Sequence, residues 1–317
     1  MGGIKIINGG ALTTLQDQGR WGAQETGFGT AGVMDNTSFR IANCLLGNKE
    51  NEAVLEATLL GPEIEFDEDN FFVLTGADMD VKLDGLSIPR YQAIAASKGS
   101  VLKMGFAREG VRGYIAFAGG LKISGVMGSK STSLKYRLGG LEGRKLMPGD
   151  SLEFSRPVTT LRHIKRRRVE PPLFQKKEWE IRVVPGPQED YFTQEGIDTF
   201  FSSPYKVLPE SDRMGYRLDG SPIAYKETVD IISDATVPGA IQVPSGGKPI
   251  ILMADRQTTG GYAKIGTVIS VDLPLLAQVA PGGQIRFKQV TVEQAQEALF
   301  HERKVLKEME RRMNGWL

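Results

Sequence analysis

Short apolar runs separated by turn residues recur along the chain and predict a structure built mainly from strands. The clearest runs have the length of a buried strand and lie at residues 4–7, 71–74, 114–118, 181–184, 229–232 and 249–254. Residues 81–88 alternate between apolar and polar positions around Asp84-Gly85, a pair that suits a two-residue hairpin turn. The 38 glycines and 16 prolines also favour strands joined by turns. We therefore expect a mainly β protein with a few helices.

Two segments have the apolar spacing of a helix. Asp35 is placed to N-cap the first helix, and Gly47 is a suitable residue to end it. Cys44 lies within this helix and has no histidine near it in the sequence, so we interpret it as a packed thiol rather than a nucleophile. The second helix is expected over residues 291–313, because a Thr-x-x-Gln capping box precedes a stripe of apolar residues.

Residues 239–262 combine a buried strand with a dense group of polar residues. A half-buried strand and a turn cluster at 244–247 lead into the apolar run 249–254. Five polar residues follow directly: Asp255, Arg256, Gln257, Thr258 and Thr259. Gly260 and Gly261 come next, and we expect them to let this loop turn closely against a small ligand. Such a loop either presents a functional site on a rigid scaffold or is a solvated surface hairpin. The residue pattern alone leaves both interpretations open.

Two other polar segments are candidate anion sites. The loop that contains Arg137 is rich in hydroxyls and lysine, although it lacks the residue order of a P-loop, and it is either an anion site or a solvated loop. Arg213 and Arg217 stand four positions apart in a turn-rich stretch. They either bind a carboxylate as a bidentate fork or pair structurally with a neighbouring acid, Asp212 or Asp219.

Two short motifs resemble cofactor signatures but lack the surrounding structure that each signature needs. GFGTAG at residues 27–32 matches G-x-G-x-x-G, but no hydrophobic strand precedes it, so we interpret it as a glycine-rich turn. VLKM at residues 101–104 is faintly similar to a biotin acceptor. Lys103 falls inside an alternating strand pattern and not at a hairpin tip. We therefore expect no biotin attached to this chain.

Composition narrows the possible functions. Lys plus Arg number 39 against 38 Asp plus Glu among the 317 residues, so the net charge of +1 gives no general attraction to nucleic acid or anionic membrane. No apolar run approaches the ~20 residues of a membrane helix, and the first residues do not resemble a secretory signal. One cysteine fits the cytoplasm. With only His163 and His301 present, we expect no metal site and no Ser-His-Asp triad.

A basic, proline-bearing segment at residues 156–180 is the expected boundary between two domains. The sequences PGDSLEF and PGGQIRF, one on each side of it, share a turn-then-strand pattern and indicate two similar barrels. We assign residues 1–165 to an N-terminal domain and residues 166–317 to a C-terminal domain with the terminal helix. The three arginines at 166–168 are expected to be solvated.

An ordered set of motifs gives the chain a resemblance to a known family. LQDQGRWG, AGVMD, GSKST, GGLEGRKLMPGD, SDRMGYRL, GAIQVPSGGKPI and DRQTTGGY occur in this order. Together they resemble the allophanate hydrolase subunit 2 family, also called the biotin-dependent carboxyltransferase family, whose bacterial members include the C subunit of 5-oxoprolinase. The resemblance covers about residues 4–290. It implies two cyclophilin-like β-barrel domains and partners related to the A and B subunits of 5-oxoprolinase.

The resemblance also implies a reaction, the ATP-dependent opening of the cyclic amide 5-oxoproline to glutamate. We expect a partner to hold most of the ATP. The reaction needs cations for anionic groups and a carboxylate for proton handling. On the family motifs, the candidate catalytic residues are Asp255 and Gln257. The candidate substrate-binding residues are Arg137, Arg213, Arg217, Gln242, Thr258 and Thr259.

Two other functions fit the same resemblance. In fused relatives the module transfers a carboxyl group from biotin to urea, and a separate carrier protein would supply the biotin here. Other relatives are antagonists of a sporulation-kinase inhibitor, a role that needs only protein binding.

Overall fold

The computed structural model describes residues 2–227 and 230–314 of the chain. Contacts between residues divide the chain into two compact units. The first unit contains residues up to Trp21, Ala31–Phe174 and the residues from Lys304 onward. The second contains Gly22–Thr30 and Gln175–Arg303. The units are therefore not contiguous in sequence, and the expected division into residues 1–165 and 166–317 needs correction.

The segment after residue 165 stays in the first unit because its backbone bonds to that unit. The amide of Ala93 donates to the carbonyl of Arg167 at 2.9 Å, and the amide of Val169 donates to the carbonyl of Tyr91 at 3.0 Å. The basic segment thus adds to an edge of the first unit, and the chain leaves this unit only after Phe174.

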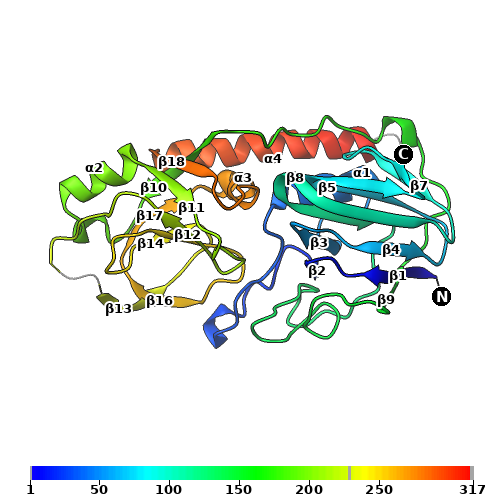
Figure 1. Ribbon diagram of the computed structural model, residues 1–317, viewed down its shortest axis with the longest axis horizontal. Coiled ribbons are helices and arrows are strands. Elements are labelled where there is room, and N and C mark those ends of the chain that lie inside the picture. The colour runs from blue at the N-terminus through cyan, green and yellow to red at the C-terminus, as the bar shows by residue number, and fades with distance from the viewer. Residues whose placement is uncertain (1, 228–229, 315–317) are drawn as a thin grey trace. The chain divides into compact units, whose positions relative to one another are not determined.

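A curled sheet of nine strands forms the first unit (Figure 1). The strands run in the order β2-β3-β8-β4-β1-β9, and the long β5 pairs with β6, β7 and β8. Their bounds are β1 (Gly3–Asn8), β2 (Leu12–Gln16), β3 (Val54–Thr58), β4 (Glu63–Phe66), β5 (Asn70–Leu83), β6 (Leu86–Ser87), β7 (Ala93–Ala96), β8 (Val101–Phe117) and β9 (Ser151–Glu153). Alternate side chains meet in a core that includes Phe66, Phe72, Phe117 and Phe154.

The expected hairpin at Asp84-Gly85 is confirmed. It joins β5 to β6, and both residues have positive φ angles, 51° and 81°, as a two-residue hairpin turn of the primed type requires. Lys103 lies in β8, as expected for a strand residue, and its Nζ is 2.9 Å from a carboxylate oxygen of Glu63 on the paired strand β4.

The first predicted helix is α1 (Asn36–Leu46), and its two end signals are confirmed. The side chain of Asp35 accepts a hydrogen bond from the amide of Ser38 at 2.8 Å, and Gly47 ends the helix with a φ of 69°. The helix packs its apolar face on β5 and β8. Cys44 is half-buried, and burial raises the pKa of its thiol to about 11. The reactive thiolate is therefore scarce at neutral pH, which confirms the packed-thiol interpretation.

The second unit is built on a closed barrel with the strand order β10-β17-β14-β15-β12-β11-β18. Its strands are β10 (Glu178–Pro185), β11 (Pro204–Val207), β12 (Gly215–Asp219), β14 (Ala240–Gln242), β15 (Ile250–Leu252), β17 (Lys264–Val268) and β18 (Gln284–Gln289). A separate two-stranded ribbon pairs β13 (Asp230–Ala235) with β16 (Thr259–Tyr262). The strand expected at residues 229–232 is described from Asp230, and residues 228–229 lie outside the described part.

The remaining helices are short except for the last one. They are η1 (Gln24–Thr26), η2 (Ile164–Arg166), η3 (Glu189–Tyr191), α2 (Gln194–Ser202), η4 (Ser270–Asp272), α3 (Leu273–Ala277) and α4 (Val292–Asn314). The predicted capping box of α4 is confirmed, because Thr291 and Gln294 exchange hydrogen bonds between side chain and backbone at 3.0 and 3.3 Å. Among the expected stripe residues, Leu306 is buried, and Ala295, Leu299, Met309 and Met313 are half-buried.

These elements confirm the predicted fold class, a mainly β protein with two barrel-like domains and a few helices. The barrel of the second unit is closed, whereas the sheet of the first unit is curled and open. No helix of the described residues is long and apolar enough to cross a membrane.

Candidate functional site

The segment 239–262 folds largely as its pattern predicts. Strand β14 leads through a turn into the buried strand β15, and the polar loop 253–258 follows. Gly260 and Gly261 differ from the expectation, because they lie within strand β16 and do not turn the loop. A Cβ atom on Gly260 would lie 2.4 Å from Nε2 of Gln242. A larger residue here would therefore require the amide end of the buried Gln242 side chain to move.

Asp255 and Arg213, two predicted site residues, form one buried ion pair. Nε and Nη2 of Arg213 donate to the two carboxylate oxygens of Asp255 at 2.9 and 3.0 Å. The side chains are only 6% and 9% exposed. The amide of Asp255 also donates to the carbonyl of Arg213 at 2.8 Å. This fork occupies the Nε and Nη2 edge of Arg213, the edge that would bind a ligand carboxylate, and it holds Asp255 at the start of the loop.

Arg256 is a buried cation that was not among the candidate catalytic or substrate-binding residues predicted from the sequence. Its side chain lies in the same loop and its exposed fraction is 2%. Nη1 donates to the hydroxyl of Thr30 at 3.1 Å, and this hydroxyl donates to the carbonyl of Ala254 at 3.3 Å. Nε is buried and has no hydrogen-bond partner. Burial lowers the pKa of Arg256 to about 10. The acid next to it in the sequence, Asp255, pairs with Arg213.

A second polar group surrounds Gln242 under the two-stranded ribbon. Gln242 is buried, and it is the register partner of Lys264 on the adjacent strand β17, so both side chains lie on one face. Nζ of Lys264 is 2.8 Å from a carboxylate oxygen of Asp234, which also accepts from Gln188 at 3.3 Å. The hydrogen bond from Lys264 lowers the pKa of Asp234. The sequence signal that could have found this group is Lys264, a lysine at the first position of the buried strand β17.

Gln257, Thr258 and Thr259 contribute their backbone to the structure. The carbonyls of Gln257 and Thr258 accept hydrogen bonds from the hydroxyl and the amide of Thr236. Thr259 begins β16 opposite Ala235 and is exposed. Gln257 and Thr258 are half-buried. Within the described residues their side chains form no hydrogen bond, so both remain free to contact a ligand.

Arg217 and Arg137 do not join this group in the way expected. Arg217 is exposed on β12, whereas Arg213 is buried, so the two do not form a shared fork. Of the two neighbouring acids, Asp219 pairs with Lys248 and Asp212 accepts hydrogen bonds from backbone amides, and Arg213 pairs with the more distant Asp255. Arg137 belongs to the first unit, where it is exposed in a turn between residues 133 and 138 with a φ of 52°.

The loop 128–144 that contains Arg137 is organised around a buried acid of its own unit. The carboxylate of Asp17 accepts hydrogen bonds from the hydroxyls of Ser129 and Ser131 and from the amide of Lys130. Nζ of Lys130 pairs with Glu52. The hydroxyls of Ser129 and Ser131 and the ammonium of Lys130 are thus occupied by internal acids, whereas Arg137 of the same loop is exposed.

GFGTAG has the expected context of a turn. The 3-10 helix η1 precedes it, and Gly27 and Gly32 have φ angles of 85° and 94°. Because a helical turn stands where a nucleotide fingerprint needs a strand, this motif does not fit a dinucleotide. Its Thr30 instead contacts Arg256.

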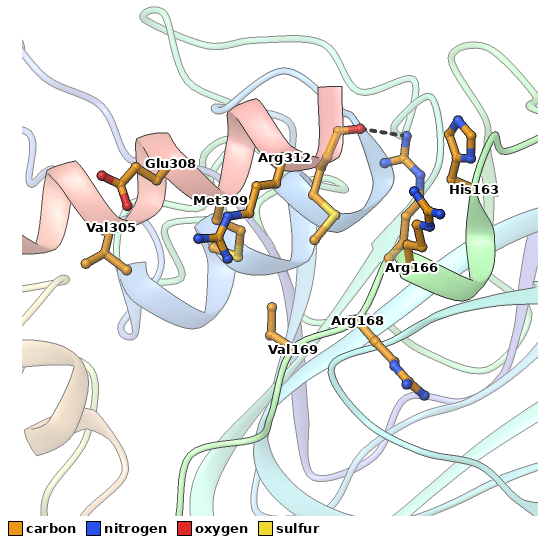
Figure 2. A pocket seen from close by; sticks show the side chains of 10 residues that line it. His163, Arg166, Arg168, Val169, Val305, Glu308, Met309 and Arg312 are labelled. Carbon is orange, nitrogen blue, oxygen red and sulfur yellow. Dashed lines mark hydrogen bonds between the residues drawn. The ribbon is translucent and has the colours of Figure 1, made fainter. Parts of the chain in front are cut away.

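A separate pocket of about 500 Å³ lies in the first unit between residues 163–169 and the end of α4 (Figure 2). Its wall is largely apolar, with Val169, Val305 and Met309, and basic side chains surround it. Of the three arginines expected to be solvated, Arg167 is in fact buried. Its guanidinium donates to the carbonyls of residues 45, 162 and 313. Residue 45 lies in the last turn of α1, and residue 313 lies in the last turn of α4. Arg167 therefore stabilises two helix C-termini.

The fold and the polar loop of the second unit match a known class. The chain belongs to the carboxyltransferase domain family, subdomains A and B, whose model matches residues 26–289. It is 39% identical over 297 residues to the C subunit of 5-oxoprolinase from Escherichia coli (strain K12), and the match covers 93% of this chain and 94% of that protein. It is 37% identical over 292 residues to the C subunit of 5-oxoprolinase from Haemophilus influenzae, with 92% and 93% of the two chains covered.

Larger proteins contain a similar region. Urea amidolyase of Saccharomyces cerevisiae is 33% identical over 310 residues, which are 92% of this chain but 17% of that protein. The crystal structure of urea amidolyase from K. lactis superposes with a TM-score of 0.90 at 28% identity, over 97% of this chain and 20% of that chain. The resemblance found in the sequence motifs is therefore confirmed at the level of the family.

Proposed function

We propose that this chain is one component of an ATP-dependent 5-oxoprolinase, which opens 5-oxo-L-proline to L-glutamate together with relatives of the A and B subunits. The observation that carries this proposal is the 39% identity to the C subunit of the Escherichia coli enzyme over nearly the whole length of both chains. That this relative is named as one of several subunits supports a heteromeric enzyme. We place the complex in the cytoplasm, as the single cysteine favours.

The polar loop of the second unit is the proposed substrate site. The lactam offers a carbonyl oxygen, an N–H and a carboxylate, and each needs a matching protein group. Gln257 and Thr258 supply half-buried amide and hydroxyl groups with no partner among the described residues. Gln242 supplies a buried amide whose Nε2 is 3.4 Å from the carbonyl of Tyr262. Asp255 fixes this loop through Arg213 and, in this proposal, acts as a positioning residue.

We assign ATP to a partner, and two segments of this chain that resemble phosphate-binding motifs support the assignment because neither fits a nucleotide. GFGTAG lacks its strand, and the hydroxyls of Ser129 and Ser131 are held by Asp17. ATP would supply the driving force for opening an unactivated amide. The chain's own part in the proposed reaction is to bind and orient the lactam. It carries no biotin in this proposal.

Reconstitution tests the proposal directly. The isolated chain should release no ADP with 5-oxoproline and ATP, and addition of the A and B subunits should give ADP and glutamate together. Pyrrolidin-2-one, which has the lactam but no carboxylate, is the matched control substrate. Turnover by the pure chain would contradict the partner requirement. A stable complex with no 5-oxoproline-dependent ADP release would contradict the proposed substrate.

A carboxyltransferase acting on urea is the second candidate. The TM-score of 0.90 to the K. lactis urea amidolyase structure favours it, and so does the description of the family as a carboxyltransferase domain. A biotinylated carrier protein would then be needed in addition. Urea-dependent ADP release that requires such a carrier, without any dependence on 5-oxoproline, would select this function over the first.

A further inference from the structure

The guanidinium of Arg256 has no acidic partner among the described residues. It is 2% exposed, and its one hydrogen bond there is from Nη1 to the Thr30 hydroxyl. Its Nε is buried without a partner. Buried charges in proteins are normally paired, because removing an ion from water is costly unless another group compensates it. An uncompensated buried cation with an open donor therefore points to a missing anion.

The other cations of this region already have their anions. Arg213 forms a fork with Asp255, the acid next to Arg256 in sequence. Lys264 is paired with Asp234 at 2.8 Å. Because these acids are occupied, the charge of Arg256 is left for a group that comes from outside the described structure.

The free edge of Arg256 shows which anion it suits. Arg213 and Arg182 each bind an aspartate through Nε and Nη2, with distances from 2.6 to 3.0 Å. In Arg256 the hydroxyl of Thr30 accepts from Nη1, and neither Nε, which is buried, nor Nη2 has a hydrogen-bond partner among the described residues. We infer that Arg256 binds the carboxylate of a small-molecule ligand through Nε and Nη2, while Thr30 holds Nη1 and fixes the plane of the guanidinium.

A carboxylate fits this edge better than a phosphate. Two parallel donors match the two coplanar oxygens of a carboxylate. One uncompensated positive charge balances a monoanion, whereas a phosphate carries more charge and a third oxygen. The inference that an anion binds here rests only on the burial of the Arg256 guanidinium and on its lack of an acidic partner among the described residues. Its assignment to the carboxylate of 5-oxoproline rests on the proposed function.

The first test measures binding to the full-length chain. Arginine Nε–H signals are followed by NMR with nitrogen-15 labelling, and the Arg256 signal is assigned by its loss in Arg256→Lys. The probes are 5-oxo-L-proline, its neutral amide 5-oxo-L-prolinamide and inorganic phosphate. We expect 5-oxo-L-proline to shift the Arg256 signal to saturation and the amide to leave it unchanged. The affinities are measured on the wild-type chain, and the Arg256→Lys variant serves only to assign the signal.

The second test uses the complex with the A and B subunits. Arg256→Lys keeps the positive charge but removes the fork, so we expect the dissociation constant and the KM for 5-oxoproline to rise about tenfold to a hundredfold. Thr30→Val leaves Arg256 in place and should weaken binding less. Arg303→Lys, on an exposed arginine of α4, is the matched control and should change neither constant.

The outcomes separate the inference from the proposed function. A shift of the Arg256 signal by phosphate alone, by acid and amide equally, or by none of the probes would overturn the carboxylate site. A normal KM in a folded Arg256→Lys complex would overturn it too, while leaving the 5-oxoprolinase proposal intact. Specific binding of 5-oxoproline by the chain, in a complex that does not turn it over, would keep the site and reject the proposed reaction.

Discussion

Asp255→Asn separates a catalytic carboxylate from a positioning carboxylate. The sequence motifs make Asp255 a candidate for acid-base work, and loss of such a group typically lowers turnover about 10²–10⁴-fold with little change in stability. The structure leads to a different expectation. Both oxygens of Asp255 accept hydrogen bonds from Arg213, and both side chains are at least nine-tenths buried. Asn has nearly the same shape but leaves the guanidinium of Arg213 without its counter-charge.

The size of the effect follows from the burial of the pair. Removing one partner of a buried ion pair costs about 3–5 kcal/mol. The Asn amide oxygen retains one acceptor for Arg213, so we expect about 2–3 kcal/mol here. For a domain of this size, 1 kcal/mol corresponds to roughly 2–4 °C in melting temperature. Asp255→Asn should therefore lower the Tm by about 4–12 °C, and a second change of Arg213 to Gln should add less than its effect alone.

Thermal melting by circular dichroism, with turnover measured on the folded complex, is the assay. The matched control is Asp219→Asn, because Asp219 and Lys248 form an exposed pair with 59% and 44% of their side chains accessible. Exposed pairs contribute about 0–1 kcal/mol, so the control should change the Tm by a few degrees at most. An unchanged Tm for Asp255→Asn together with a turnover about 10²-fold lower would refute the positioning role and establish the catalytic one.

Two further predictions concern a glycine and a lysine. Gly260→Ala should displace the side chain of Gln242, because the new Cβ would lie 2.4 Å from its Nε2. We therefore expect a higher KM for 5-oxoproline in the complex. The control is Gly246→Ala, where no atom lies within 4 Å of the added Cβ. Lys103 should carry no biotin, since it is a strand residue paired with Glu63. The intact mass of the chain from biotin-replete cells should equal the mass of the unmodified polypeptide. A stoichiometric biotin adduct at Lys103 would instead favour the urea carboxyltransferase.

The sequence predicted correctly those structural features that depend on residues close together in the chain. The cap at Asp35, the stop at Gly47 and the hairpin at Asp84-Gly85 each depend on residues within a few positions of one another, and each was predicted correctly. The strand-then-loop character of residues 239–262 was local as well. In contrast, Gly260-Gly261 looked like a turn because the sequence does not show that β16 pairs with β13, a strand that ends at Ala235.

The ion pairs depend on distant residues, and this is why the roles of the arginines were not predictable. Asp255 lies 42 positions from Arg213, and Thr30 lies 226 positions from Arg256. Arg213 and Arg217 look equivalent in sequence, but Arg217 lies in strand β12 and is exposed, whereas Arg213 precedes that strand and is buried beside Asp255. Spacing along the chain could select polar residues for a site. It could not show which of them neutralise one another.

One carboxylate therefore decides which arginine is available to a ligand. If Asp255 paired with its neighbour Arg256, the open fork would belong to Arg213, the residue chosen from the sequence. Because Asp255 instead binds Nε and Nη2 of Arg213, the same edge of Arg256 is left open. The ion pair fixes the loop that carries Arg256, and Thr30 fixes its guanidinium. Charge compensation at Arg213 and its absence at Arg256 are therefore the grounds on which we propose a positioning role for the first and ligand binding for the second.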